Sequence, residues 1–200
     1  MAYGRTAGWC ALLLVLSAGV RAAEPPRVGM PVPPLGDGPW TFDTAEQQRI
    51  RVSVVTRGLS HPWAMAFLPD GSMLITERAG RIRVLRNGAL DPRPLAGLPA
   101  IRTDGTGGLM DLALNPQFER NRLVYFTYTK PVQDGMGTPT LARGRLEGHA
   151  LVDVRDLVVP DTYPGNSGLN GRVTFGPDGK VYMSTGGRSQ DDVVNVAQDP

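Results

Sequence analysis

The sequence predicts an all-β protein that is built as a β-propeller, and two observations lead to that prediction. Short apolar runs alternate with turns, and the 25 glycines and 18 prolines supply many turn positions. Units of similar pattern then return at spacings of roughly 40–60 residues, as propeller blades do. The 41% hydrophobic share is enough for a packed core.

The first complete unit covers residues 62–86. An apolar run at 62–68 is followed by the turn Pro69-Asp70-Gly71 and a second apolar run at 72–77. Proline presets the first turn dihedral angle, aspartate caps the turn, and glycine accepts a positive φ, so a hairpin is expected. After another turn, residues 81–86 alternate charged and apolar side chains, which predicts a third strand with one wet face.

The same pattern returns twice. The segments of the second copy are residues 108–114, 115–121, 123–128, 141–146 and 151–159. The segments of the third copy are residues 172–175, 176–179 and 180–185. A β-sandwich also has short strands and turn clusters and is the alternative fold. The repeated Phe-x-Pro-Asp-Gly phrase, at Phe67 and at Phe175, favours repeating blades, and no helix longer than a turn or two is needed after the leader.

The N-terminal segment, residues 1–22, has the features of a secretory signal peptide. Arg5 precedes an apolar run at 9–16, which is shorter than the about 20 residues that a membrane span needs. Small residues near Ala22 predict cleavage after that position, which predicts a periplasmic or secreted protein with no membrane span after signal removal. Cys10, the single cysteine, would be removed with the leader, so disulfides and thiolate chemistry are excluded.

Residues 23–48 are rich in proline and glycine and are expected to form an extended N-terminal arm. Strand pattern begins at 50–55, so residues 49–200 are expected to form the propeller part. The net charge is +2 with no basic stripe, which argues against nucleic acid as a partner. No glycine-rich segment has the ending of a phosphate-binding loop.

Four phrases of the sequence together resemble the glucose/sorbosone dehydrogenase family, the soluble PQQ-dependent aldose dehydrogenases. They are residues 58–67, 76–81, 107–118 and 172–179, in the order in which the family has them. The resemblance implies a six-bladed propeller, of which this chain would cover about the first three blades. It also implies pyrroloquinoline quinone (PQQ) and calcium as cofactors, and hydride transfer from C1 of an aldose to the quinone while a histidine accepts the hydroxyl proton.

The residue-by-residue match departs from the family at its functional positions. The position of the histidine base is occupied by Gly168, so no catalytic residue is predicted, and Thr106 stands where the family has a glutamine. His61 belongs to a phrase that we interpret as structural, and a solvated turn is expected for His149. The candidates for a substrate pocket are Thr106, Asn170, Arg172 and Arg188.

No metal site is predicted from the residues themselves. Asp191 and Asp192 are adjacent carboxylates without further spaced oxygen ligands, so a solvated loop is the expected alternative for them and for the polar residues nearby. The cage of a metal-dependent lactonase cannot be assembled. Two functions remain open: PQQ-dependent oxidation of aldose sugars, and a non-catalytic exported propeller that binds carbohydrate or protein. An open propeller edge would also allow a dimer or another pairing.

Overall fold

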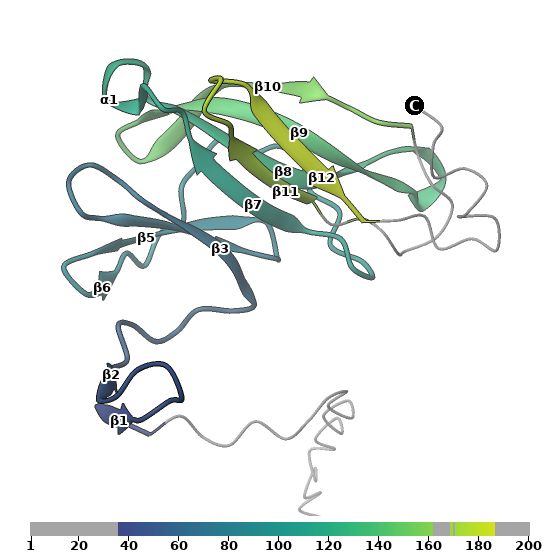
Figure 1. Cartoon of the computed structure of the whole chain (residues 1–200). Coiled ribbons are helices and arrows are strands. Elements are labelled where there is room, and N and C mark those ends of the chain that lie inside the picture. Colours follow the sequence, from purple (N-terminus) through teal and green to yellow (C-terminus); the bar gives the residue numbers. More distant parts are fainter. Residues whose placement is uncertain (1–35, 162–168, 170, 187–200) are drawn as a thin grey trace, which may run out of the picture. The chain divides into compact units, whose positions relative to one another are not determined.

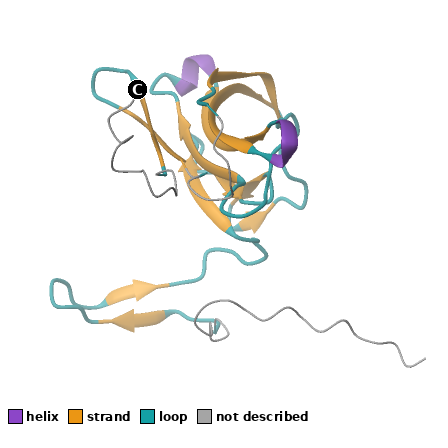
Figure 2. Cartoon of the chain, turned by 90° about the vertical axis from the view of Figure 1, so that its right-hand side faces the viewer, coloured by secondary structure: helices purple, strands orange, loops and turns teal. Residues whose placement is uncertain are grey.

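The computed structural model describes residues 36–161, 169 and 171–186, without the side chain of residue 134. The chain divides into two compact units, Met1–Asp37 and Gly38–Pro200, and every described strand lies in the second. Strands make up nearly all of the regular structure (Figures 1 and 2). The leader at 1–22 lies outside the described residues, among which no helix is long and apolar enough to cross a membrane.

A short hairpin precedes the larger sheets. Its strands are β1 (Trp40–Phe42) and β2 (Ile50–Val52), and they pair antiparallel. The backbone N–H of Arg49 donates to the carboxylate of Asp43 at 2.7 Å, which closes the loop between them. β1 was not expected from the sequence, which has only an extended arm before residue 49.

The first four-stranded sheet is an antiparallel meander in which neighbours in sequence are neighbours in space. Its strands are β3 (Pro62–Phe67), β4 (Met73–Glu77), β5 (Arg81–Arg86) and β6 (Ala89–Leu90). The turn between β3 and β4 forms as expected: Gly71 has φ +81°, and Asp70 accepts the hydroxyl of Ser72 at 2.6 Å. Of these strands, only β6 was missed from the sequence.

The second four-stranded sheet has the same order and is longer. Its strands are β7 (Leu109–Leu114), β8 (Leu123–Pro131), β9 (Gly137–Glu147) and β10 (Ala150–Val158). One helical turn, α1 (Phe118–Asn121), joins β7 to β8, and a 3-10 turn, η1 (Gln133–Gly135), joins β8 to β9. These two turns are the helical elements of the described residues, as the sequence predicted.

A third sheet is described by two paired strands, β11 (Gly171–Phe175) and β12 (Val181–Thr185). The turn between them repeats the one after β3: the N–H of Gly179 donates to the carbonyl of Gly176 at 3.0 Å. Phe67 ends β3 and Phe175 ends β11, so the two Phe-x-Pro-Asp-Gly phrases occupy the same place in their sheets.

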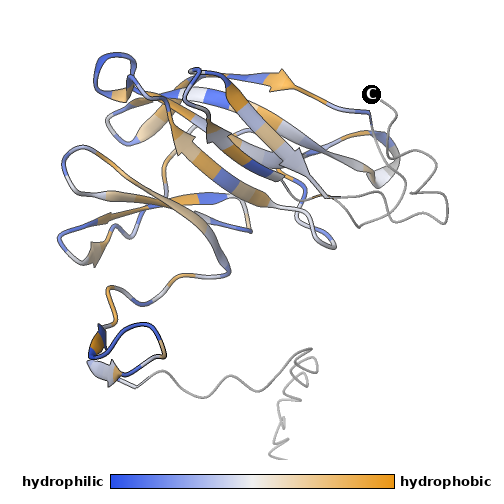
Figure 3. Cartoon of the chain, viewed as in Figure 1, coloured by the Kyte–Doolittle hydropathy of each residue, from blue (hydrophilic) through white to orange (hydrophobic). Residues whose placement is uncertain are grey.

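The sheets contact one another through their first strands: β3 packs against β7, and β7 packs against β11. One apolar cluster lies between the first two sheets, where Leu74 and Ile82 meet Leu112. A second cluster lies between the second and third sheets, where Tyr125 and Leu141 meet Val173. Polar residues gather in the turns at the strand ends (Figure 3). Successive meanders whose first strands adjoin are arranged as propeller blades, and this arrangement contradicts the β-sandwich alternative.

Candidate functional site

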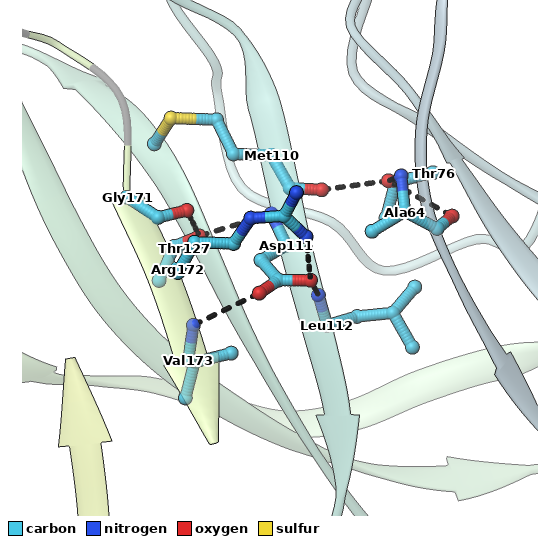
Figure 4. Close-up of polar contacts among 9 residues, drawn as sticks. All are labelled: Ala64, Thr76, Met110, Asp111, Leu112, Thr127, Gly171, Arg172 and Val173. Atoms are coloured by element: carbon cyan, nitrogen blue, oxygen red, sulfur yellow. Dashed lines mark hydrogen bonds and ion pairs between the residues drawn. The ribbon is translucent and has the colours of Figure 1, made fainter. Parts of the chain in front are cut away.

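A buried threonine links the first sheet to the second. Thr76 on β4 accepts the backbone N–H of Ala64 at 3.0 Å, and its hydroxyl lies 2.6 Å from the carbonyl oxygen of Met110 on β7 (Figure 4). The side chain is fully buried, and β3 has a bulge beside Ala64. The hydroxyl therefore satisfies an N–H that the bulge leaves unpaired and fixes the neighbouring sheet.

The second sheet repeats this link toward the third. Thr127 on β8 accepts the N–H of Asp111 at 3.0 Å and donates to the carbonyl of Gly171 at 2.9 Å (Figure 4). Two residues further along, Thr129 lies 3.1 Å from the N–H of Gly108 and 3.3 Å from the carbonyl of Leu169. These contacts hold the start of β11, the segment to which Arg172 belongs.

Asp111 is a buried carboxylate in the middle of an otherwise apolar strand. One of its oxygens accepts the N–H of Leu112 at 3.0 Å, and the other accepts the N–H of Val173 on β11, also at 3.0 Å. The guanidinium of Arg172 lies 3.8 Å from the same carboxylate (Figure 4). Asp111 thus joins the second and third sheets and carries a charge that holds the arginine.

Arg172 brings the first and third sheets together. Its guanidinium carbon lies 4.6 Å from the centre of the Trp63 ring, and Trp63 belongs to β3. A guanidinium at this distance over an indole is in a cation–π contact. The side chain of Arg172 is nevertheless 68% exposed, so it remains available to a ligand.

A pocket of about 260 Å³ surrounds this arginine. Its lining residues are Trp63, Gly171, Arg172, Ser184, Thr185 and Gly186. The lining offers one cation, one aromatic surface and two hydroxyl groups, a combination that suits a ligand with carboxylate and hydroxyl groups. We call it the Arg172 pocket.

The residues predicted for a substrate pocket differ in where the structure places them. Arg172 is among the residues that line the pocket, and its role in binding stays a prediction. Thr106 is exposed in the loop before β7 and is not among the residues lining the pocket. Asn170, Arg188 and the base position Gly168 lie outside the described residues.

Neither histidine lines the Arg172 pocket. His61 is exposed at the start of the first sheet, where its ring lies 3.3 Å from the hydroxyl of Ser60. His149 lies in the turn between β9 and β10, where its ring is partly exposed and lies 2.9 Å from the carbonyl oxygen of Arg93. In the described part of the chain, no group of three or more histidine, cysteine or acidic side chains could hold a metal ion.

Glu77 is another buried carboxylate, and its contacts give it a structural role. It is fully buried, accepts the N–H of Ser60 and the Nε–H of Arg81 at 2.6 Å each, and lies 3.5 Å from Arg83. Burial alone would raise the pKa of Glu77, but the Ser60 hydrogen bond and the two arginines outweigh it and lower the pKa. All its oxygens are engaged, so this carboxylate fixes the start of the first sheet.

Three residues of the site were not predicted from the sequence. Trp63 and Ser184 line the Arg172 pocket, and Asp111 contacts the Arg172 guanidinium. A signal existed for Asp111, because an ionisable residue inside the apolar run of 109–114 needs buried partners. Trp63 stands in a phrase interpreted as structural, and Ser184 is an ordinary strand residue by pattern. Only the fold brings the three together.

The adjoining meanders define part of a β-propeller, and the pocket is lined by residues of β3, β11 and β12. The glucose/sorbosone dehydrogenase family matches residues 59–200. The chain therefore belongs to this family, and the sequence prediction of its fold and family is confirmed.

Relatives and solved structures agree with this assignment. An uncharacterized protein of a Synechocystis strain is 42% identical over 151 residues, covering 71% of this chain and 36% of that protein. Quinoprotein glucose dehydrogenase B of Acinetobacter calcoaceticus is 28% identical over 165 residues, covering 76% and 34%. The apo-form crystal structure of the soluble aldose sugar dehydrogenase of Escherichia coli superposes with a TM-score of 0.62 at 36% identity, covering 70% of this chain and 41% of that one. The chain thus spans little more than a third of the length of these curated relatives.

Proposed function

We propose that this chain contributes to PQQ-dependent oxidation of aldose sugars. The observation that carries the proposal is Arg172, because the family match runs through the strand that bears it and the structure gives it an exposed guanidinium in a pocket. Relatives named aldose sugar dehydrogenase and quinoprotein glucose dehydrogenase support the same substrate and cofactor class.

The Arg172 pocket fits part of a PQQ molecule. PQQ is planar and carries three carboxylates, and it supplies the carbon that accepts hydride from the sugar. Arg172 would pair with a carboxylate, and the Trp63 ring would offer a flat surface. Asp111 would hold the arginine in place, while the hydroxyls of Ser184 and Thr185 could hydrogen-bond to the quinone or the sugar.

Proton removal is the step for which this chain has no predicted group. In the family a histidine accepts the proton of the C1 hydroxyl, and here its position is Gly168, which has no side chain to accept one. The proton would then pass to water, so we expect slow turnover. Calcium stays an expectation from the family, since the described residues offer no cluster of acidic ligands.

Gly168 also favours a second function, an exported propeller that binds carbohydrate or another protein without turnover. Such a protein would keep a polar pocket and lose the base. We place either function in the periplasm or outside the cell, on the strength of the leader predicted at residues 1–22.

Reconstitution distinguishes the two functions. The purified chain is incubated with PQQ and Ca²⁺, and oxidation of aldoses is followed by reduction of an electron-accepting dye. Dye reduction that requires both PQQ and an aldose supports the dehydrogenase. PQQ binding without dye reduction supports the non-catalytic alternative, and the absence of PQQ binding overturns the dehydrogenase proposal.

A further inference from the structure

A short segment links the outer edges of the first two sheets. Residues 91–97, which follow β6 and which we call the strap, run along β5, where the N–H of Leu95 donates to the carbonyl of Ile82 at 2.8 Å. The Leu95 side chain is buried in the apolar cluster between the two sheets. On its other side the strap pairs with the second sheet through a parallel bridge between Ala96 and Ala150. Both sheets are described with all four strands, so the strap joins two sheets whose edges are on view.

The strap approaches the turn between β9 and β10 closely. The N–H of Ala96 donates to the carbonyl of His149 at 3.1 Å, and the N–H of Leu151 donates to the carbonyl of Ala96 at 2.9 Å. Gly97 has φ +90°, and a Cβ atom at this position would collide with the carbonyl oxygen of Leu151. Only glycine suits such a position, so the strap lies directly against the turn that carries His149.

The His149 ring lies between two acceptors of the strap. Its Nε2 is 2.9 Å from the carbonyl oxygen of Arg93, and its Nδ1 is 3.8 Å from the carboxylate of Asp91. A carbonyl oxygen only accepts hydrogen bonds, so in the neutral ring the proton is on Nε2 and Nδ1 presents a lone pair to the carboxylate. Protonation adds an N–H at Nδ1 and converts this unfavourable approach into an ion pair. The two acceptors therefore suit the charged ring better than the neutral one.

The Asp91 carboxylate is ionised over the pH range in which a histidine titrates. The backbone N–H of Arg93 donates to it at 2.9 Å and is the largest cause of its lowered pKa, which the nearby positive charges lower further. The other charged residues at the adjoining strand ends are Arg86 on β5, and Arg145 and Glu147 on β9. Arg145 and Glu147 form an ion pair with each other, whereas Asp91 faces the ring.

We propose that the strap and His149 form a pH-sensitive clasp, in which protonation of the ring tightens the docking of the strap on the second sheet. The ion pair with Asp91 is present in acid, where the ring is charged, and is lost as the pH rises and the ring becomes neutral. Because the clasp spans two sheets, the pH sets how readily their outer edges separate. Neither Asp91 nor His149 lines the Arg172 pocket, so the clasp does not rest on the proposed function.

Hydrogen exchange of the Ala96 and Leu151 amides tests the clasp. Protection factors, which are corrected for the intrinsic pH dependence of exchange, are measured by NMR at about pH 5 and about pH 8, on either side of the histidine titration. Both amides should be about two- to fivefold better protected in acid, as expected of a partly exposed ion pair. His149→Gln keeps a side-chain N–H for Arg93 without the charge and should lose this difference. Asp91→Asn, which keeps an acceptor for the Arg93 N–H, should lose it as well.

His61→Asn is the matched control, because His61 is the second of the two histidines and is exposed. Asparagine tolerates the φ of +48° at this position, and the variant should keep the better protection in acid. NMR of the ring nitrogens gives a second measure, since the neutral His149 ring should carry its proton on Nε2. Equal protection at both pH values in the wild type, an unchanged pH difference in His149→Gln or Asp91→Asn, or a neutral ring protonated on Nδ1 would each overturn the proposal.

Discussion

The hydroxyl of Thr76 lies 2.6 Å from the carbonyl oxygen of Met110, so a side chain of the first sheet is hydrogen-bonded to the inner strand of the second. Thr127 and Gly171 have the same relation between the second and third sheets. Two apolar clusters hold the sheets face to face, while these hydroxyls set the register of the inner strands. That register places Arg172 beside Trp63.

Removing either hydroxyl should destabilise the fold. Thr76→Val and Thr127→Val keep the side-chain shape but leave a buried N–H and carbonyl unsatisfied, which costs about 1–3 kcal/mol. Urea unfolding followed by circular dichroism measures the change. Thr103→Val, at an exposed loop position, is the control and should change stability by less than about 0.5 kcal/mol. Equal effects of Thr76→Val and Thr103→Val would show that the link has no energetic role.

Asp111→Ala should loosen the third sheet from the second. The N–H of Val173 loses its acceptor and Arg172 loses its counter-charge, with an expected cost of about 1–3 kcal/mol. Hydrogen exchange gives a local readout, since the Val173 amide should become markedly less protected. Asp104→Ala removes a largely exposed carboxylate and should leave this amide unchanged. Unaltered protection of Val173 in Asp111→Ala would refute the role given to Asp111.

Glu77 should make stability depend on acid pH. Its folded pKa lies below the ordinary value of 4.5, so its contribution is fully present above pH 4.5 and is lost as the pH falls through the folded pKa. Glu77→Gln should cost about 3 kcal/mol at neutral pH, because Arg83 loses its buried partner. The variant should also lose less stability than the wild type between pH 4.5 and pH 3.

Unfolding free energies measured across that pH range check this prediction. Asp70, Asp91 and Asp178 also have lowered pKa values, from hydrogen bonds to neighbouring residues, and they contribute equally to both proteins. The difference between the two curves therefore isolates Glu77. Parallel curves would contradict the assignment.

Gly168→His should restore a base at the position where the family has one. A positioned base contributes roughly 10²–10⁴-fold, so PQQ-dependent aldose oxidation should rise by about 10²-fold or more. Lys180→His places the same side chain in the exposed turn after β11 and is the control, with no rise expected. No gain in Gly168→His, in a preparation that binds PQQ, would show that the missing histidine is not what limits turnover.

Most strands could be predicted because their side chains alternate between core and solvent or are uniformly apolar. β9 is the informative exception, because it begins at Gly137 whereas the apolar pattern begins at Leu141. Thr138 and Thr140 are fully buried there, and the hydroxyl of Thr138 donates to the carbonyl of Pro160 at 2.7 Å. A hydropathy pattern does not reveal polar side chains that are buried together with their hydrogen-bond partners. β1 was missed since glycine and proline fill the segment directly before it.

The site was less predictable than the fold. Arg172 was a candidate from the family phrase, but its surroundings come from three separate sheets, with Trp63, Asp111 and Ser184 far apart in sequence. Their proximity depends on the order of the sheets around one axis, which local pattern does not contain. The departure from the family at Gly168, in contrast, is recognised from the sequence, because it concerns the residue type at the position of the histidine base.

PQQ binding tests most directly the claim that the Arg172 pocket is a cofactor site. Equilibrium dialysis of PQQ against the purified chain, with and without Ca²⁺, should show saturable binding to one site per chain. Arg172→Ala should weaken that binding at least about tenfold, since it removes a charge-assisted pair with a carboxylate. Arg120→Ala, which changes an exposed arginine on α1, should leave it unchanged. Absence of saturable binding, or equal affinity in wild type and Arg172→Ala, would contradict the claim.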